Sequence, residues 1–156
     1  MTAQERRIVV GVDGSDSSKA ALRWAIGQAK LTGSSVEAVT AWHFSAGYGL
    51  SPGSAGGFDF EANAKNTLTE ALAEVSAFEP DVPVRPVVAG GPAAEVLLRE
   101  AKGADLLVVG SRGHGGFASV VLGSVSMYCA LHAHVPVLIF RDGREGGQAP
   151  DGTQGP

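Results

Sequence analysis

Residues 105–124 read DLLVVGSRGHGGFASVVLGS, in which a short apolar run is followed at once by a turn rich in glycine. The run at 105–109 is apolar after Asp105, which predicts a strand buried on both faces, as in a parallel sheet. Beyond the turn, a helix is predicted from about Gly123 to His132. A buried strand, a turn and a helix in this order form the repeating unit of an α/β fold.

The same unit recurs along the chain of 156 residues. Further strands are predicted at 8–12, 36–42, 84–88 and 135–140, with helices of apolar periodicity between the strands. Strands that alternate with helices in this way predict one α/β domain with a five-stranded parallel sheet. Helices would cover both faces of that sheet, which gives a three-layer sandwich.

Two segments do not fit a regular element. Residues 45–57 contain five glycines, three serines and a proline, which is typical of a flexible surface loop or lid. Residues 142–156 are rich in glycine, proline and glutamine, and we expect a disordered tail there. The expected organisation is therefore one domain at 1–141 followed by this tail.

Composition narrows the classes of function. The net charge is −4 and the twelve lysines and arginines are scattered, whereas a nucleic-acid surface needs clustered positive charge, so we expect no nucleic acid as partner. The one cysteine, Cys129, excludes an internal disulfide and suits the cytoplasm. No stretch approaches the roughly 20 apolar residues of a membrane span. We therefore expect a cytoplasmic protein without a membrane partner.

The glycine-rich turn is the first candidate for a binding site. Its glycines let the backbone approach a ligand closely, and its N–H groups can form a concavity that binds anions. The start of the following helix adds a partial positive charge, and Ser124 and Ser126 add hydroxyls. These donors suit a triphosphate. The alternative is a loop that needs glycine only in order to turn.

Two familiar phosphate-binding motifs differ from this turn. A P-loop needs a lysine directly after a glycine, and no glycine in this chain is followed by lysine, which excludes that class. Residues 113–118 fit the loose dinucleotide pattern G-x-G-x-x-A. Only one predicted strand follows them, however, whereas a dinucleotide-binding fold needs a full second half.

A longer pattern that includes both ends of the turn is more specific. Gly110 and Gly113, followed after nine residues by Gly123 and Ser124, match G-x2-G-x9-G-[S/T]. This spacing resembles the nucleotide-binding signature of the universal stress protein family. Other stretches resemble family segments in the same order, namely 9–15, 90–92, 105–113 and 132–138. The resemblance extends from about residue 7 to residue 141.

The resemblance implies an adenine nucleotide alpha-hydrolase-like fold with strand order 3-2-1-4-5, and ATP bound across the ends of the first and fourth strands. The nucleotide-binding residues that it implies are Gly11, Val12, Asp13, Ala41, Val109, Gly110, Gly113, His114, Gly123, Ser124, Val125 and Ser126. Asp13 would lie near the ribose or near Mg²⁺ on the phosphates, and Ala41 would offer its backbone to adenine. Judged from the residues alone, Asp13 could instead be a turn residue, and His114 an exposed loop histidine.

The resemblance also implies a homodimer that pairs through the last strand, which begins at Val135 and ends at Phe140. No general base with an orienting partner is recognisable, so efficient phosphoryl transfer is not expected. We therefore expect an ATP-binding regulator or sensor of stress that is at most a slow ATPase. Two alternatives stay open. One is a nucleotide-free stress or scaffold protein, and the other a slow ATPase or autophosphorylating protein with Ser124 or Ser126 as acceptor.

Overall fold

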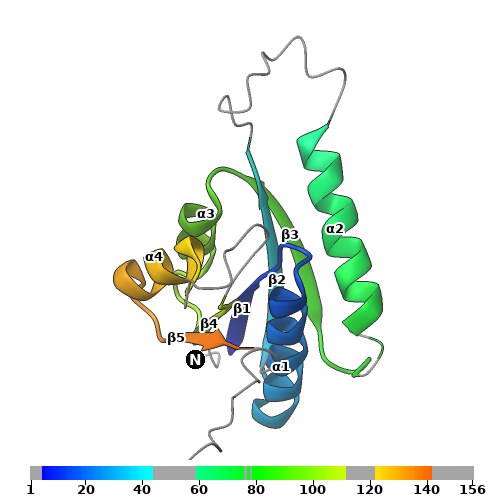
Figure 1. Cartoon of the computed structure of the whole chain (residues 1–156). Helices are drawn as coiled ribbons and strands as arrows, with labels where there is room; N and C mark the ends of the chain where they lie inside the picture. The colour runs from blue at the N-terminus through cyan, green and yellow to red at the C-terminus, as the bar shows by residue number, and fades with distance from the viewer. Residues whose placement is uncertain (1–4, 44–58, 76, 78, 112–121, 142–156) are drawn as a thin grey trace, which may run out of the picture.

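The computed structural model describes residues 5–43, 59–75, 77, 79–111 and 122–141 (Figure 1). The elements in chain order are β1 (Arg7–Gly11), α1 (Asp16–Thr32), β2 (Ser35–Trp42), α2 (Phe60–Val75), β3 (Val84–Gly90), α3 (Ala93–Glu100), β4 (Leu106–Gly110), α4 (Ser124–His132) and β5 (Val137–Phe140). The predicted loop at 45–57, the predicted tail at 142–156, and Gly113 and His114 of the predicted site lie outside the described residues.

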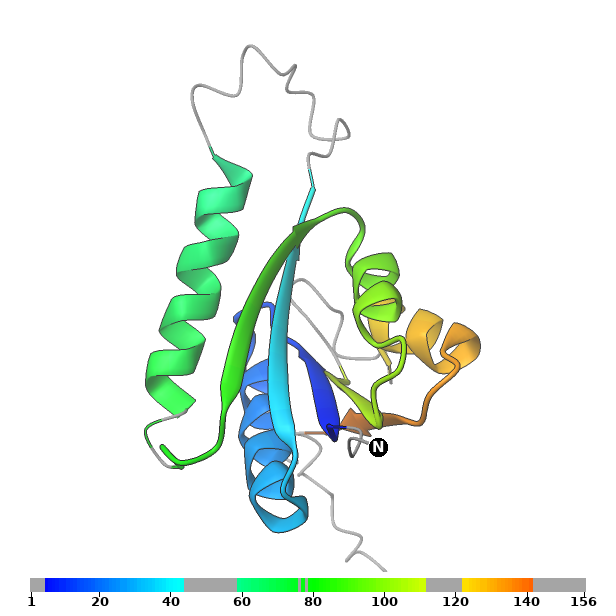
Figure 2. The same ribbon diagram turned by 180° about the vertical axis from the view of Figure 1, so that it is seen from behind.

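The five strands form one parallel sheet in the order β3-β2-β1-β4-β5. This confirms the predicted fold class and strand order. Figures 1 and 2 show the three layers, with α1 and α2 on one face of the sheet and α3 and α4 on the other. The chain moves from β1 outward to β3, then returns to β4 on the other side of β1. The carboxyl ends of β1 and β4 therefore flank the switch point, where α/β sheets bind their ligands.

Each face of the sheet has its own apolar core. Ile8 and Val10 of β1 pack with α1 and α2, whereas Val9 between them packs with α3 and α4. All three are buried, and a fully buried side chain of this size contributes about 1.5–3 kcal/mol. Burial on both faces explains why the strands read as continuous apolar runs. Cys129 lies in the second core, and burial raises the pKa of its thiol to about 11.

The helix and strand boundaries have identifiable physical causes. The N-cap of α1 is Ser15, whose Oγ accepts the backbone N–H of Ser18 (3.2 Å). Gly33 ends α1 in the left-handed region (φ 74°). β5 begins two residues later than predicted, after Pro136, which has no N–H to donate to the sheet.

A buried carboxyl group stands near the amino end of the sheet, far along the strands from the switch point. Glu37 of β2 lies between Arg7 (3.4 Å) and Arg85 (3.6 Å). Arg7 also donates to the backbone carbonyls of Glu100 (2.9 Å) and Lys102 (2.8 Å), so it ties β1 to the end of α3. Burial raises the pKa of Glu37 above its ordinary value, although the two arginines act against that rise. These charges serve the fold.

Neither a membrane span nor a metal cluster is formed by the described residues. None of the helices in this part of the chain is both long enough and apolar enough to cross a bilayer. No three side chains of histidine, cysteine, aspartate or glutamate in it come together as metal ligands.

Candidate functional site

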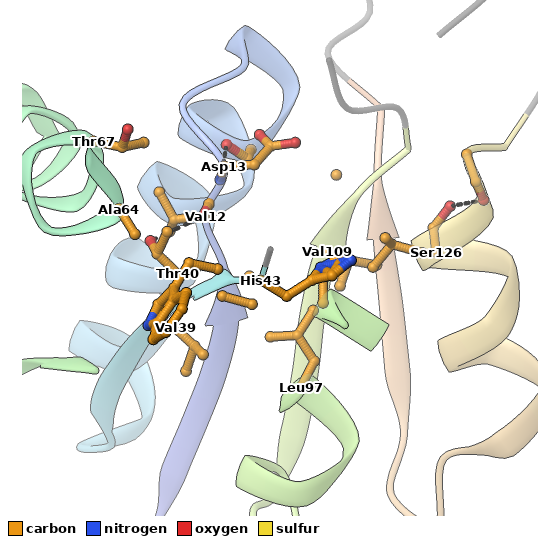
Figure 3. A pocket seen from close by; sticks show the side chains of 18 of the residues that line it. Val12, Asp13, Val39, Thr40, His43, Ala64, Thr67, Leu97, Val109 and Ser126 are labelled. Atoms are coloured by element: carbon orange, nitrogen blue, oxygen red, sulfur yellow. Dashed lines mark hydrogen bonds between the residues drawn. The ribbon is translucent and has the colours of Figure 1, made fainter. Parts of the chain in front are cut away.

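A cavity of about 590 Å³ opens at the carboxyl ends of the strands (Figure 3). It is bordered by the ends of β1, β2 and β4, by the first turn of α4 and by one face of α2. Its volume falls in the range of pockets that hold small molecules. It lies at the switch point between β1 and β4, where the fold alone predicts a ligand.

Ten of the twelve predicted site residues are described by the structure, and all ten line this one cavity. They are Gly11, Val12, Asp13, Ala41, Val109, Gly110, Gly123, Ser124, Val125 and Ser126. They come from four segments far apart in the sequence, and the parallel sheet brings them together because β1 lies between β2 and β4.

Asp13 is held in a turn directly after β1. Its Oδ1 accepts the backbone N–H of Ser15 (2.9 Å) and the Ser15 hydroxyl (2.5 Å), which is the geometry of an Asx-turn. Asp13 is therefore a turn residue, which was the alternative to a ligand-binding role in the sequence analysis. The same carboxyl group also lines the cavity, so the turn fixes its position at the edge of the site.

The end of β2 extends past the end of β1, which exposes part of its backbone to the cavity. The Val39 carbonyl accepts from the Val12 N–H (2.8 Å), and in a parallel sheet Ala41, two residues further on, faces the same way. The next donor to β2 would be Gly14, two residues after Val12, but Gly14 (φ 85°) already lies in the turn between β1 and α1. Ala41 therefore presents peptide groups to the cavity, as a backbone contact to adenine would require.

Gly110 is a glycine because β4 ends against the start of α1. A Cβ atom at this position would lie 2.4 Å from Ser17 Oγ and 2.9 Å from the Ser17 carbonyl carbon. Both distances are shorter than real Cβ contacts, and the second involves backbone that cannot move aside easily. The first glycine of the signature thus has a packing role, which sequence spacing alone could not separate from a binding role.

Ser126 lies where the end of β4 and the start of α4 are joined by hydrogen bonds. Its hydroxyl lies within hydrogen-bond distance of the carbonyls of Gly123 (3.0 Å) and Ser111 (3.4 Å), and its residue is only 2% exposed. The Gly123 N–H also donates to the Ser111 carbonyl (2.6 Å), and the Ser111 N–H donates to Phe140 of β5 (2.9 Å). We call these contacts the clasp. They fix Gly110 and Gly123 relative to each other on either side of residues 112–121.

The start of α4 offers donors to an anion. Its N-cap is Gly123, which has no side chain to cap the helix, and no acidic residue lies in the first turn. The first N–H groups of any helix lack partners within the helix and carry its partial positive charge. The residues at 124–126 line the cavity, and the Ser124 side chain is exposed there. This end of the cavity is chemically suited to phosphate.

The sequence did not reveal the opposite wall, which helix α2 supplies. Four of its residues line the cavity: Phe60, Asn63, Ala64 and Thr67. Polar residues at helical spacing are common on any surface helix, so no signal in the sequence marked them. Trp42 borders the cavity and packs on Gly90, whose added Cβ would meet the indole at 3.1 Å. Figure 3 shows His43 extending from the end of β2 toward Val109.

Comparisons with known proteins agree with this geometry. Residues 5–141 match the model of the universal stress protein family. A universal stress protein of Mycobacterium tuberculosis (strain H37Rv) is 38% identical over 141 residues, which cover 88% of this chain and 46% of that protein. The chain thus spans about half the length of the curated relatives it matches.

Solved structures share the same fold. The universal stress protein UspA from Lactobacillus plantarum superimposes with a TM-score of 0.73 and 24% identity, over 90% of this chain and 100% of that chain. A universal stress protein in complex with cAMP gives a TM-score of 0.66 and 28% identity, over 89% of this chain and 98% of that chain. With the sheet order, the family model and these relatives in agreement, this chain belongs to the universal stress protein family.

Proposed function

We propose that this protein binds an adenine nucleotide, ATP with Mg²⁺, in the cavity at the strand ends, and that it acts as a nucleotide-dependent regulator or sensor of stress. One observation carries the proposal. All ten described residues of the predicted nucleotide site line a single cavity with an uncapped helix N-terminus at one end. The related structure that holds cAMP supports an adenine nucleotide as the ligand.

ATP is favoured over a nucleotide with fewer phosphates because the first turn of α4 offers several donors. The N–H groups at 124–126 and the Ser124 hydroxyl provide a place for more than one phosphate group. The Asp13 carboxylate, which the Asx-turn holds at the rim, would help to hold Mg²⁺ bound to the nucleotide, and the ion would neutralise phosphate charge.

A regulatory role is favoured over efficient catalysis by the charge of the cavity. Among the described lining residues there is no lysine or arginine to neutralise a phosphoryl group during transfer. The Ser126 hydroxyl is engaged in the clasp, which makes it a poor acceptor for autophosphorylation. We include a cytoplasmic location and the domain limits 1–141 in the proposal, on the sequence grounds given above.

A homodimer through β5 is also part of the proposal. Among the described residues, β5 is an edge strand whose outer N–H and C=O groups face no further strand. The neighbouring helix α4 exposes Met127 (49%), Tyr128 (43%) and Leu131 (74%), which a second copy would cover. Leu131→Glu should shift the protein toward monomer in sedimentation velocity, whereas the control Leu31→Glu on α1 should leave the association state unchanged. Equal behaviour of both variants and the parent would contradict this interface.

The nucleotide proposal is tested by two measurements on the purified protein. Denaturation should release an adenine nucleotide that mass spectrometry identifies, and calorimetry on the stripped protein should show binding of ATP in the presence of Mg²⁺. Failure of both would overturn the proposal and favour the nucleotide-free scaffold.

A further inference from the structure

Helix α2 forms the wall of the cavity that the glycine signature does not include. Its residues Phe60, Asn63, Ala64 and Thr67 follow the spacing i, i+3, i+4 and i+7, so they share one face of the helix. Ala64 is buried, Thr67 is half-buried and Asn63 is exposed at the lip. The side chains of this face that can form hydrogen bonds are therefore Asn63 and Thr67.

The topology of the sheet places this wall opposite the start of α4. α2 packs on β2 and β3, and α4 packs beside β5 and α3. β1 and β4 lie between these groups in the sheet, and neighbouring strands are about 4.8 Å apart. Figure 3 shows the same arrangement, with Thr67 and Ala64 on one side of Asp13 and with Val109 and Ser126 on the other. The cavity therefore has two separate ends.

This separation determines the direction in which a nucleotide lies, given the function proposed above. Phosphates are drawn to the first turn of α4, where the donors and the helix dipole are. The base must then lie at the other end, between the exit of β2 and the face of α2. That end is lined by the rings of Trp42 and Phe60, which suit the flat face of a base.

Among the described side chains of the α2 wall, Asn63 is suited to distinguish one purine from the other. Its amide carries both an acceptor and a donor, which match the N6 amino group and the N7 acceptor of adenine as a pair. Guanine presents two acceptors, O6 and N7, along the same edge, so one half of the pair would be lost. We propose that Asn63 is a specificity-determining residue that selects adenine over guanine, with Thr67 one turn further along the same wall.

Calorimetry with ATP and GTP, each with Mg²⁺, tests this assignment on the full chain. The parent protein should bind ATP more tightly than GTP. Asn63→Ala should weaken ATP binding about 5- to 10-fold, as expected for loss of one or two hydrogen bonds, and should change GTP binding by less than about 2-fold. Asn66→Ala is the matched control, because Asn66 is exposed on the same helix but does not line the cavity.

A second pair of variants checks the same wall without changing side-chain volume. Thr67→Val should weaken ATP binding about 2- to 5-fold, whereas Thr69→Val, on an exposed position of α2, should have no effect.

If the parent binds ATP but Asn63→Ala leaves the ratio of ATP to GTP affinity unchanged, the role assigned to Asn63 is wrong and the proposed function stands. If the parent binds neither nucleotide, the proposed function fails and this inference fails with it.

Discussion

The two ends of the cavity are built in different ways. The end at α4 is made of backbone, with an uncapped helix start at Gly123 and a clasp that fixes it to Ser111. The end at α2 adds side chains to the exposed backbone of Ala41, with Asn63 and Thr67 projecting from one face of a helix. The backbone end suits a phosphate chain of any nucleotide, whereas the side-chain end can choose among bases.

This difference explains which parts of the site can be predicted from the sequence. A site made of backbone restricts which residue types can occur. Gly110, for example, has no room for a Cβ atom. Such restrictions produce a characteristic spacing of glycines in the sequence. A side-chain wall on a helix constrains little beyond size and polarity. Its residues can therefore change between related proteins without any change of fold, and selectivity can change with them.

The largest effect should come from filling the space at Gly110. Gly110→Ala places a Cβ atom against Ser17, and overpacking with a backbone contact should lower the free energy of unfolding by about 3 kcal/mol. Urea denaturation measures this loss. ATP binding should fall more than about 10-fold as well, because the ends of β4 and α1 must separate.

The matched control for that variant is a glycine with free space around it. Nothing lies within 4 Å of a Cβ atom added at Gly27 in the interior of α1. Gly27→Ala should therefore stabilise the protein by about 0.5–1 kcal/mol and leave ATP binding unchanged. If Gly110→Ala behaved like Gly27→Ala, the packing explanation of the signature glycine would be wrong.

The next variant separates phosphate binding at the start of α4 from the stability of the fold. Ser124→Glu places a negative charge at the first turn of α4, where it stabilises the helix by about 0.3–1 kcal/mol but repels phosphates. We expect ATP affinity to fall about 10-fold while the melting temperature stays the same or rises. Adenosine, which has no phosphate, should bind Ser124→Glu and the parent equally, and a loss of both ligands would contradict the assignment of the phosphates to α4.

A smaller effect should follow from opening the clasp. Ser126→Ala removes a hydroxyl between the Gly123 and Ser111 carbonyls, which should cost about 1 kcal/mol of stability and about 3- to 5-fold in ATP affinity. Ser124→Ala, at an exposed position, should leave stability within about 0.5 kcal/mol. We expect Ser126 to act by positioning, so stability and affinity should fall together in Ser126→Ala, and a loss of affinity without a loss of stability would favour a direct contact instead.

The smallest effect should arise at the amino end of the sheet, away from the cavity. Burial raises the pKa of Glu37 above 4.5, so the folded protein keeps this proton in a pH range where the unfolded chain has lost it. The Glu37 contribution to stability is therefore present below that range and is lost as pH rises through the raised pKa. Glu37→Gln should remove this loss in denaturation curves compared from pH 4 to 7, and ATP affinity should not change.

Much of the fold could be predicted from the sequence because burial on both faces produces apolar strands such as 105–109, and alternation with helices forces a parallel sheet. The strand ends of the site were predicted for the same reason. The N-cap of α1 could not be predicted from the sequence, since Ser15 and its neighbours are all able to cap a helix and the Asx-turn at Asp13 decides among them. The α2 wall was missed because its position depends on tertiary packing.

The most direct test of the two-ended cavity is a crystal structure of the protein with ATP and Mg²⁺. The account predicts phosphates against the N–H groups at the start of α4, and a base between the exit of β2 and Asn63 on α2. A base at the α4 end, or an empty cavity at saturating ATP, would contradict it.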